Sequence, residues 1–269
     1  MSRSVVVTGT GMGIGRAIAD RLAADGWVVV GVERDPAADA GSCADVVTGD
    51  TAERGTHAEA ARRALALAPL GGWVNNAGIT EPTPLHALDE DAVRAVVAIN
   101  GLGYLWGCAA AVEAFAAQGR PGAIVNIGSI HGRVSYPQHA AYEFTKGGVD
   151  ALTRSVAVTY GPYGVRANAV APGGVRTPHL QAHIAASADP AATERELAQG
   201  PPLRRIAEPG EVAAVVAFLL SDDASYVSGQ SVAVDGAWTA AFSNPPDDPE
   251  LRRLFATGRS DVQDEPGRG

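Results

Sequence analysis

Short apolar runs alternate along the chain with longer stretches of helical periodicity. The segment SVVVTG (4–9) is a continuous β-branched run, which is typical of a strand buried on both faces. The next segment, 14–25, places Ile14, Ile18 and Leu22 on one face of a helix. The alternation continues to residue 236 and predicts strands at 4–9, 27–33, 44–50, 71–78, 122–129, 165–173 and 230–236, and helices at 14–25, 52–68, 89–117, 139–160 and 208–220.

This alternation of strands and helices predicts a parallel sheet covered on both faces. Right-handed crossovers then give a doubly wound α/β fold with ligand sites at the carboxyl ends of the strands. After residue 243 the composition shifts to Pro, Asp, Gly and Arg. We therefore expect a single domain at 1–243 with a substrate loop at 174–202, and a tail at 244–269 with a short helix around 249–256.

Composition narrows the function classes. The chain has 269 residues, 46% of them hydrophobic and 19% charged, which suits one large globular domain. Its net charge of -9 and the lack of a basic stretch argue against nucleic-acid binding. No apolar run of about 18 residues is expected to span a membrane, and the N-terminus has no signal-peptide pattern.

The cysteines and histidines point to neither a disulfide framework nor a metal site. Cys43 and Cys108 are too few for a framework, although a single bridge stays open, and a reducing, cytoplasmic setting fits them better. The histidines at 131, 139, 179 and 183 do not have the spacing of metal ligands. No metal is therefore expected.

A glycine-rich segment, TGTGMGIG (8–15), lies between the first predicted strand and the first helix. It fits the pattern T-G-x-x-x-G-x-G, in which glycines let the backbone approach a phosphate at a helix N-terminus. The alternative is an ordinary tight turn with spare glycines. The position between strand and helix favours a dinucleotide site, with candidate contacts at Gly9, Gly11, Met12, Gly13, Ile14 and Gly15.

The second predicted strand ends at Glu33, which follows Gly15 by 18 residues. An acidic residue near this offset hydrogen-bonds the ribose hydroxyls of an adenine nucleotide, and its charge repels a 2′-phosphate. Arg34 is the counter-argument, since an arginine accepts that phosphate. NAD is therefore favoured, and NADP is the less favoured alternative.

Lys146 is the only lysine among 21 basic residues, and it follows Tyr142 by one helical turn. The pKa of a free tyrosine is about 10, and a nearby cation lowers it toward neutrality. The lowered value would suit general acid–base catalysis. An ammonium can serve a phenol and a ribose together, which a planar guanidinium does poorly. Chance placement of the one lysine is the alternative.

Further polar residues follow other predicted strands at the same edge of the sheet. Ser129 ends the strand AIVNIGS thirteen residues before Tyr142, NNAG (75–78) ends another, and Pro172 and Gly173 end a third. Together with the glycine segment, these motifs resemble those of the short-chain dehydrogenase/reductase family, in its short single-domain branch, over about residues 4–240. The resemblance implies a Rossmann-type seven-stranded sheet, a nicotinamide cofactor and a homotetramer or dimer.

The resemblance also implies roles for individual residues. Tyr142 is then the catalytic acid/base, Lys146 lowers its pKa and holds the nicotinamide ribose, and Ser129 polarises the substrate oxygen. Asn100 matches the helix asparagine that positions a water in the proton relay. Contacts to the adenosine are implied for Asp50, Thr51, Asn76, Ala77 and Gly78, and contacts to the carboxamide for Pro172, Gly173, Val175 and Thr177. Asp50 competes for its role with Asp45.

The expected function is an NAD-dependent oxidoreductase acting on a secondary alcohol or ketone. The alternative is a cofactor-binding regulatory or scaffold protein without turnover, which would need the glycine segment but not Ser129, Tyr142 and Lys146. An extended-type epimerase is disfavoured because the chain lacks the required second domain. The motifs do not define the substrate. His131 and the segment from Gly174 onward should line its pocket beside Ser129 and Tyr142, with a weak similarity to sugar dehydrogenases.

Overall fold

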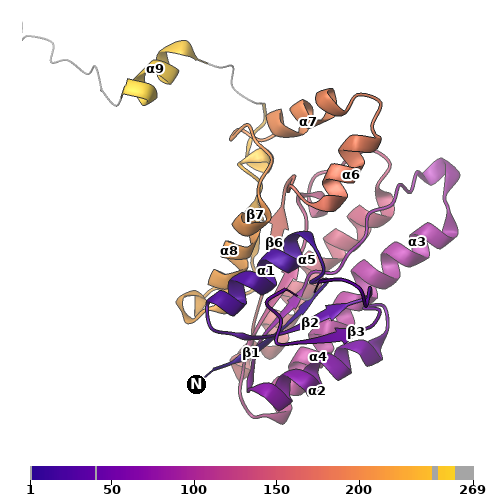
Figure 1. Cartoon of the computed structure of the whole chain (residues 1–269), viewed down its shortest axis with the longest axis vertical. Coiled ribbons are helices and arrows are strands. Elements are labelled where there is room, and N and C mark those ends of the chain that lie inside the picture. The colour runs from indigo at the N-terminus through magenta and orange to yellow at the C-terminus, as the bar shows by residue number, and fades with distance from the viewer. Residues whose placement is uncertain (1, 40, 244–247, 258–269) are drawn as a thin grey trace, which may run out of the picture.

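The computed structural model describes residues 2–39, 41–243 and 248–257. These residues form a seven-stranded sheet in the order β3-β2-β1-β4-β5-β6-β7, and every neighbouring pair is parallel (Figure 1). The predicted doubly wound α/β fold is confirmed. The strands are β1 (Ser4–Thr8), β2 (Val28–Glu33), β3 (Asp45–Thr48), β4 (Leu70–Asn75), β5 (Ala123–Ile127), β6 (Arg166–Pro172) and β7 (Ser231–Val234).

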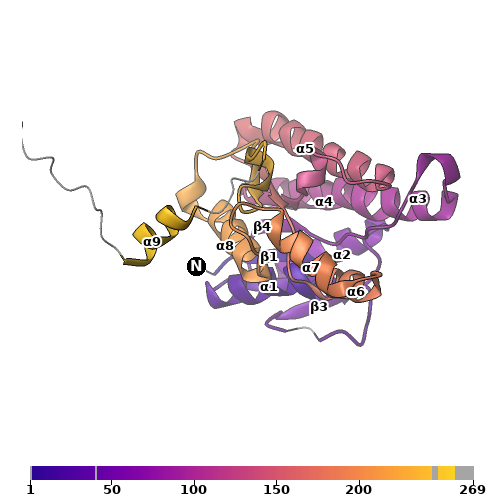
Figure 2. The same cartoon turned by 90° about the horizontal axis from the view of Figure 1, so that it is seen from above.

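Helices cover both faces of this sheet (Figure 2). One face carries α1 (Gly13–Ala24) and α8 (Pro209–Leu220). The other carries α2 (Arg54–Leu67), α4 (Gly103–Ala117) and α5 (Ala140–Tyr160). Successive strand residues point to opposite faces, so both core layers need apolar residues and the strands become continuous apolar runs.

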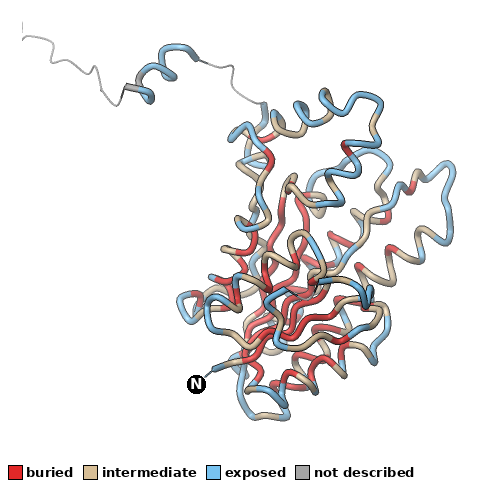
Figure 3. The backbone as a smooth tube through the Cα atoms, in the orientation of Figure 1, coloured by how far each residue is buried: buried red, intermediate tan, exposed pale blue. Residues whose placement is uncertain are grey.

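The first strand shows this arrangement directly. Val5 and Val7 pack against α1 and α8, whereas Val6 packs against the layer that contains α2 and α4. All three side chains are fully buried. The buried backbone therefore follows the strands through the middle of the molecule (Figure 3).

The helix predicted at 89–117 is not uniform. It consists of α3 (Glu90–Val96), a π-helical turn (Val97–Leu102) and α4. Within Glu90–Ala117, an 18-residue window reaches a mean hydropathy of 1.6, so the expectation that no stretch is long and apolar enough to cross a membrane is wrong for this helix. Buried residues make up 44% of that window, and α4 packs on the sheet beside α2.

The segment 174–202 contains two helices that the hydrophobic pattern did not predict, α6 (Pro178–Ala186) and α7 (Pro190–Gln199). Each begins with a proline after a capping side chain. The Thr177 hydroxyl accepts a hydrogen bond from the Leu180 amide, and the Asp189 carboxylate accepts one from the Ala192 amide. A cap followed by proline is a helix-start signal, so these helices were readable from capping residues rather than from periodicity.

Residues beyond the sheet form a separate short helix, α9 (Pro249–Thr257), where the sequence predicts one. It lies away from the sheet in both views (Figures 1 and 2). The remaining parts of the predicted tail, 244–247 and 258–269, lie outside the described residues. Cys43 and Cys108 are both free. Short 3₁₀ turns occupy Leu85–Ala87, Ile130–Gly132, Gly161–Tyr163, Asp222–Ala224 and Trp238–Ala240.

Candidate active site

The predicted site residues gather at one edge of the sheet, where the parallel strands end. The strand order reverses between β1 and β4, and this is where open α/β sheets have their ligand crevice. The glycine turn follows β1, and Asn76 follows β4 at the same point. Ser129 follows β5, and Gly173 follows β6.

The glycine turn has no room for side chains at the positions that the motif fixes. Gly9 and Gly13 have φ angles of +72° and +56°, which favour glycine. A Cβ atom at Gly15 would overlap the carbonyl oxygen of Gly9. The bare backbone therefore leads directly into the N-terminus of α1, which fits the diphosphate of a dinucleotide. The intervening Met12 is 61% exposed.

The segment after β4 is tied to this turn by hydrogen bonds. The Thr8 hydroxyl accepts from the backbone amides of Asn76 and Ala77 at 2.9 and 3.0 Å. The Asn76 side-chain amide donates to the carbonyl oxygen of Thr8 at 2.8 Å. The predicted contacts Asn76, Ala77 and Gly78 thus lie beside the glycine turn, and their backbone conformation depends on Thr8.

Glu33 reaches from the end of β2 to the same turn. Its carboxylate accepts hydrogen bonds from the backbone amides of Gly11 and Arg34, both at 2.8 Å. It is therefore held where the sequence predicts a contact to the adenine ribose. Arg34 is exposed next to it.

The two candidate aspartates near β3 are distinguished by their partners. Asp45 lies within β3 and forms an ion pair with Arg63 at 3.1 Å. Asp50 follows β3 and accepts a hydrogen bond from the Ala52 amide at 2.8 Å. Thr51 is buried, and its carbonyl oxygen accepts from His57 Nε2 at 2.8 Å. Asp50 and Thr51 therefore sit at the carboxyl edge, whereas Asp45 is engaged elsewhere.

The segment after β6 forms the opposite wall of the crevice. The Gly173 amide donates to the carbonyl oxygen of Val234 at 3.1 Å, and Val175 is buried in a bridge with Ala207. A Cβ atom at Gly13 would lie 3.2 Å from Thr177 Cγ2. The glycine turn and this segment, which begins at Pro172, therefore face each other closely across the predicted cofactor site.

Ser129 lies beside Tyr142. Ser129 is 8% exposed, and its Oγ accepts a hydrogen bond from the His131 amide at 3.1 Å. The Ser129 and Thr80 side chains lie near the Tyr142 phenol, and hydrogen bonding from them acts to lower its pKa. Burial raises the pKa of Tyr142, and the two hydrogen bonds oppose that rise. Thr80 was not predicted, because it belongs to no motif and reaches the site only through the fold.

Lys146 is 4% exposed and lies on the same helix as Tyr142. Its Nζ donates to the carbonyl oxygen of Ile127 at 2.8 Å and to the Tyr104 hydroxyl at 3.4 Å. It lies 5.6 Å from the centroid of the Tyr142 ring. Tyr104 was also missed, although it follows Asn100 by one helical turn.

The lowering of the Tyr142 pKa by Lys146 stays a prediction, and in the chain without cofactor burial acts against it. Burial lowers the pKa of Lys146 to about 7, so the ammonium itself is destabilised. The pKa of Tyr142 is raised instead, since burial outweighs its hydrogen bonds to Ser129 and Thr80. Both groups lie in the same desolvated site, which favours their neutral forms.

Asn100 lies in the π-helical turn and is fully buried. Its side chain accepts from the Ile79 amide at 2.9 Å and donates to the Ile79 carbonyl at 2.8 Å. It thereby holds the loop that carries Thr80 next to Tyr142. Its part in a water relay stays a prediction.

An aromatic cluster adjoins Tyr142 through His131. The His131 ring lies 6.2 Å from the Tyr142 ring, edge to face, and 5.9 Å from Tyr136. Its Nδ1 lies 3.3 Å from the Val134 carbonyl, which only accepts, so Nδ1 carries a proton. Burial lowers the pKa of His131. Among the described residues, no group of three or more His, Cys, Asp or Glu side chains could hold a metal.

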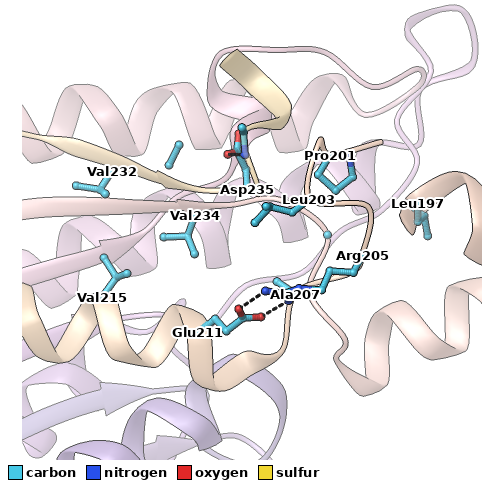
Figure 4. Close-up of a pocket in the computed structure, with 14 residues that line it drawn as sticks. Leu197, Pro201, Leu203, Arg205, Ala207, Glu211, Val215, Val232, Val234 and Asp235 are labelled. Atoms are coloured by element: carbon cyan, nitrogen blue, oxygen red, sulfur yellow. Dashed lines mark hydrogen bonds and ion pairs between the residues drawn. The ribbon is translucent and has the colours of Figure 1, made fainter. Parts of the chain in front are cut away.

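A pocket of about 290 Å³ borders the predicted substrate residue Gly174 (Figure 4). Val215, Val232 and Val234 form part of an apolar wall, and Arg205 and Glu211 are paired at its edge. Neither Ser129 nor Tyr142 lines it. The pocket is therefore separate from the proposed reacting groups.

Three comparisons with known proteins agree with this geometry. A family model described as enoyl-(acyl carrier protein) reductase matches residues 9–239. The cis-4-hydroxycyclohexanecarboxylate dehydrogenase of Sinomonas cyclohexanicum is 43% identical over 248 residues, covering 88% of this chain and 97% of the relative. The 3beta-hydroxysteroid dehydrogenase 1 of Eggerthella lenta is 35% identical over 250 residues, covering 88% of this chain and 94% of the relative.

A solved structure has the same fold. It is a gluconate 5-dehydrogenase from Burkholderia cenocepacia in complex with NADP and tartrate, with a TM-score of 0.81 and 30% identity. The alignment covers 90% of this chain and 97% of that one. At this identity and coverage the likeness extends over the whole sheet and its helices.

The buried lysine predicts an unusual pH dependence of stability. The folded chain releases the Lys146 proton near pH 7, whereas the unfolded chain holds it to about pH 10. The free energy of unfolding should therefore rise between these pH values. Lys146→Met should be more stable than the wild type at pH 7 and below, by on the order of a few kcal/mol, and the gap should close toward pH 10. Urea unfolding at several pH values measures this.

Arg154→Met is the matched control, since Arg154 is an exposed cation on the same helix. It should leave the pH dependence unchanged. Parallel stability curves for the wild type and Lys146→Met would contradict the interpretation of Lys146 as a buried, uncompensated charge.

Proposed function

The chain belongs to the short-chain dehydrogenase/reductase family, and we propose that it interconverts a ring-borne secondary alcohol and its ketone with NAD. As a member of this family it is an oxidoreductase that acts on CH–OH groups with a nicotinamide cofactor. The proposal is carried by one observation: Tyr142, which lies beside Ser129, shares a helix with the buried Lys146 at the crevice of the glycine turn.

Proton transfer in this proposal is the work of Tyr142. In alcohol oxidation, its ionised oxygen takes the substrate hydroxyl proton, while Ser129 donates a hydrogen bond to the substrate oxygen. Lys146 stabilises the ionised phenol and holds the cofactor ribose. The chemistry that bound NAD supplies is acceptance of a hydride at its nicotinamide ring. A regulatory or scaffold protein would have no use for this acid–base arrangement.

A ring substrate is supported by the surroundings of Tyr142 and by the relatives. The His131 ring lies 6.2 Å from the Tyr142 ring and 5.9 Å from the Tyr136 ring, so an aromatic surface adjoins Tyr142. Because the pKa of His131 is lowered, its imidazole is neutral near pH 7 and presents an apolar face with one acceptor nitrogen. The names of both relatives specify a hydroxyl on a saturated ring system.

An alcohol panel tests the reaction and the ring preference together. Cyclohexanol, cis-4-hydroxycyclohexanecarboxylate and a 3β-hydroxysteroid should reduce NAD faster than 2-butanol or gluconate, followed by the absorbance of reduced nicotinamide. Tyr142→Phe should lower kcat by about 10²- to 10⁴-fold and leave NAD affinity largely intact.

The control for that variant is Tyr163→Phe, which removes the hydroxyl of a 75% exposed tyrosine. It should behave as the wild type does. A faster reaction with the open-chain alcohols would sink the ring proposal, whereas turnover in Tyr142→Phe would remove the phenol from the mechanism.

The choice of NAD is proposed from Glu33. Its carboxylate is held against the glycine turn by the Gly11 amide, so a 2′-phosphate would meet a fixed negative charge there. The counter-argument is the exposed Arg34, together with the NADP in the gluconate 5-dehydrogenase structure. The hydrogen bond that holds Glu33 on the ribose side favours NAD.

Glu33→Ala should narrow the preference for NAD over NADP, because it removes both the repulsion between the carboxylate and the 2′-phosphate of NADP and the contact to the ribose of NAD. Asp35→Ala is the matched control, since it deletes an exposed carboxylate two residues away and should leave the ratio unchanged. Dissociation constants for both cofactors measure the effect. Equal affinities of the wild type for NAD and NADP would contradict the assignment.

We also propose that a second copy of the chain covers the outer face of α4 and α5. Phe144 and Val158 are 74% and 78% exposed on α5, and Leu105 is 45% exposed on α4. Phe144, Ala151 and Val158 recur every seven residues on one helix face. Exposed apolar surface of this kind is typical of subunit contacts, and a self-complementary contact would give a dimer or, with a further interface, a tetramer.

Phe144→Glu should shift the oligomer toward monomer, because a charge would be buried in the contact. Light scattering coupled to gel filtration measures the mass. Tyr226→Glu, at a fully exposed aromatic residue elsewhere, should have no effect. A monomeric wild type would refute the proposed contact.

A further inference from the structure

The helix that carries Tyr142 and Lys146 begins without a cap of its own. The N-cap residue of α5 is His139, whose side chain makes no capping hydrogen bond. The His139 Nδ1 lies instead 2.8 Å from the carbonyl oxygen of Pro137. The first amides of a helix have no partner within it, so a buried helix start needs an acceptor from elsewhere.

Thr83 supplies that acceptor from a distant loop. Its Oγ1 accepts a hydrogen bond from the Ala141 amide at 3.0 Å, the bond that an N-cap side chain would normally make. Its own amide donates to the Gln138 carbonyl at 2.7 Å, and it forms a bridge with His139. The Thr83 side chain is fully buried, so water cannot take over these contacts.

The local sequence makes this loop stiff. Thr83 lies between Pro82 and Pro84, and a residue that precedes proline is restricted to extended conformations. On the other side of the contact, Gln138 has a φ angle of +67°, a left-handed conformation that is unfavourable for a residue other than glycine. Such strain persists only where the surroundings impose it, and here the bond to Thr83 helps to impose it.

The same loop also reaches the reacting group. Thr80 lies near the Tyr142 phenol and lowers its pKa through hydrogen bonding, and Tyr142 directly follows the amide that Thr83 holds. We propose that Thr83 is a positioning residue that sets the start of α5, and with it the alignment of the Tyr142 phenol with Ser129 and Thr80. This proposal rests on the role of Tyr142 given under the proposed function.

Thr83→Val removes the acceptor and keeps the shape of the side chain. It should lower kcat by about 10- to 100-fold, the scale of a small misplacement of a catalytic group, while the dissociation constant for NAD stays near that of the wild type. Because the bonds from Ser129 and Thr80 favour the ionised phenol, the rise of alcohol oxidation with pH should shift to higher pH. Thr83→Ser, which keeps the hydroxyl, should restore both kcat and the pH profile.

Asp89→Ala is the matched control. Asp89 caps α3 through the amides of Asp91 and Ala92, at 2.9 and 3.2 Å, so this variant loses a helix cap but leaves the hydrogen bond from Ala141 to Thr83 in place. It should be destabilised and yet keep the wild-type pH profile. If Asp89→Ala shifted the pH profile of alcohol oxidation as Thr83→Val does, Thr83 would act only through the stability of the fold.

Two further results would overturn the proposal. One is a wild-type pH profile and kcat in Thr83→Val, and the other is a loss of kcat in Thr83→Ser as large as that in Thr83→Val. Should Thr83→Val not fold, Thr83→Ala removes the same hydroxyl and is read in the same way. Amide hydrogen exchange in the full wild-type chain tests the contact independently of turnover, and fast exchange at Ala141 would refute it. A wild type and Asp89→Ala that both fail to turn over any alcohol would instead count against the proposed function.

Discussion

All seven strands run in the same direction, and the position of every site residue depends on this constraint. Parallel strands place their carboxyl ends at one edge, so residues from distant parts of the sequence meet there without long connections. The reversal of strand order between β1 and β4 opens the crevice at that edge. The glycine turn and Asn76 stand at the reversal, whereas Ser129 and Gly173 follow the next two strands.

A buried polar chain connects the sheet to the helix that carries the proposed catalytic residues. The Asn75 amide donates to Asn126 Oδ1 at 2.8 Å across β4 and β5, and the Asn126 amide donates to the Thr153 hydroxyl at 3.0 Å on α5. All three residues are buried. An unpaired buried amide is costly, so these bonds favour one register of the two strands and one position of α5, and thereby bring Ser129 to Tyr142.

The site also places groups in environments that oppose their charged forms. Among the described residues, Lys146 has the Ile127 carbonyl and the Tyr104 hydroxyl as its hydrogen-bond partners, and burial lowers its pKa. The same environment raises the pKa of Tyr142. Burial thus opposes the charged forms of both groups in the chain without cofactor, and a bound dinucleotide would change the charges that they face.

The sequence by itself determined the fold class and most of the site, because both follow from short-range patterns. Continuous apolar strands between amphipathic helices specify a parallel sheet, and a motif residue at the end of such a strand must lie at the carboxyl edge. This is how Glu33 and Ser129 could be placed without a structure, whereas Tyr142 and Lys146 were found from their spacing of one turn on a predicted helix. Only the tertiary structure decided which distant side chains complete the site. Thr80, Thr83 and Tyr104 belong to no motif, and they reach α5 only because the loop after β4 and the helix after the π turn are packed against it. The direction of the Tyr142 pKa likewise depends on desolvation by the folded chain, which no spacing along the sequence reports.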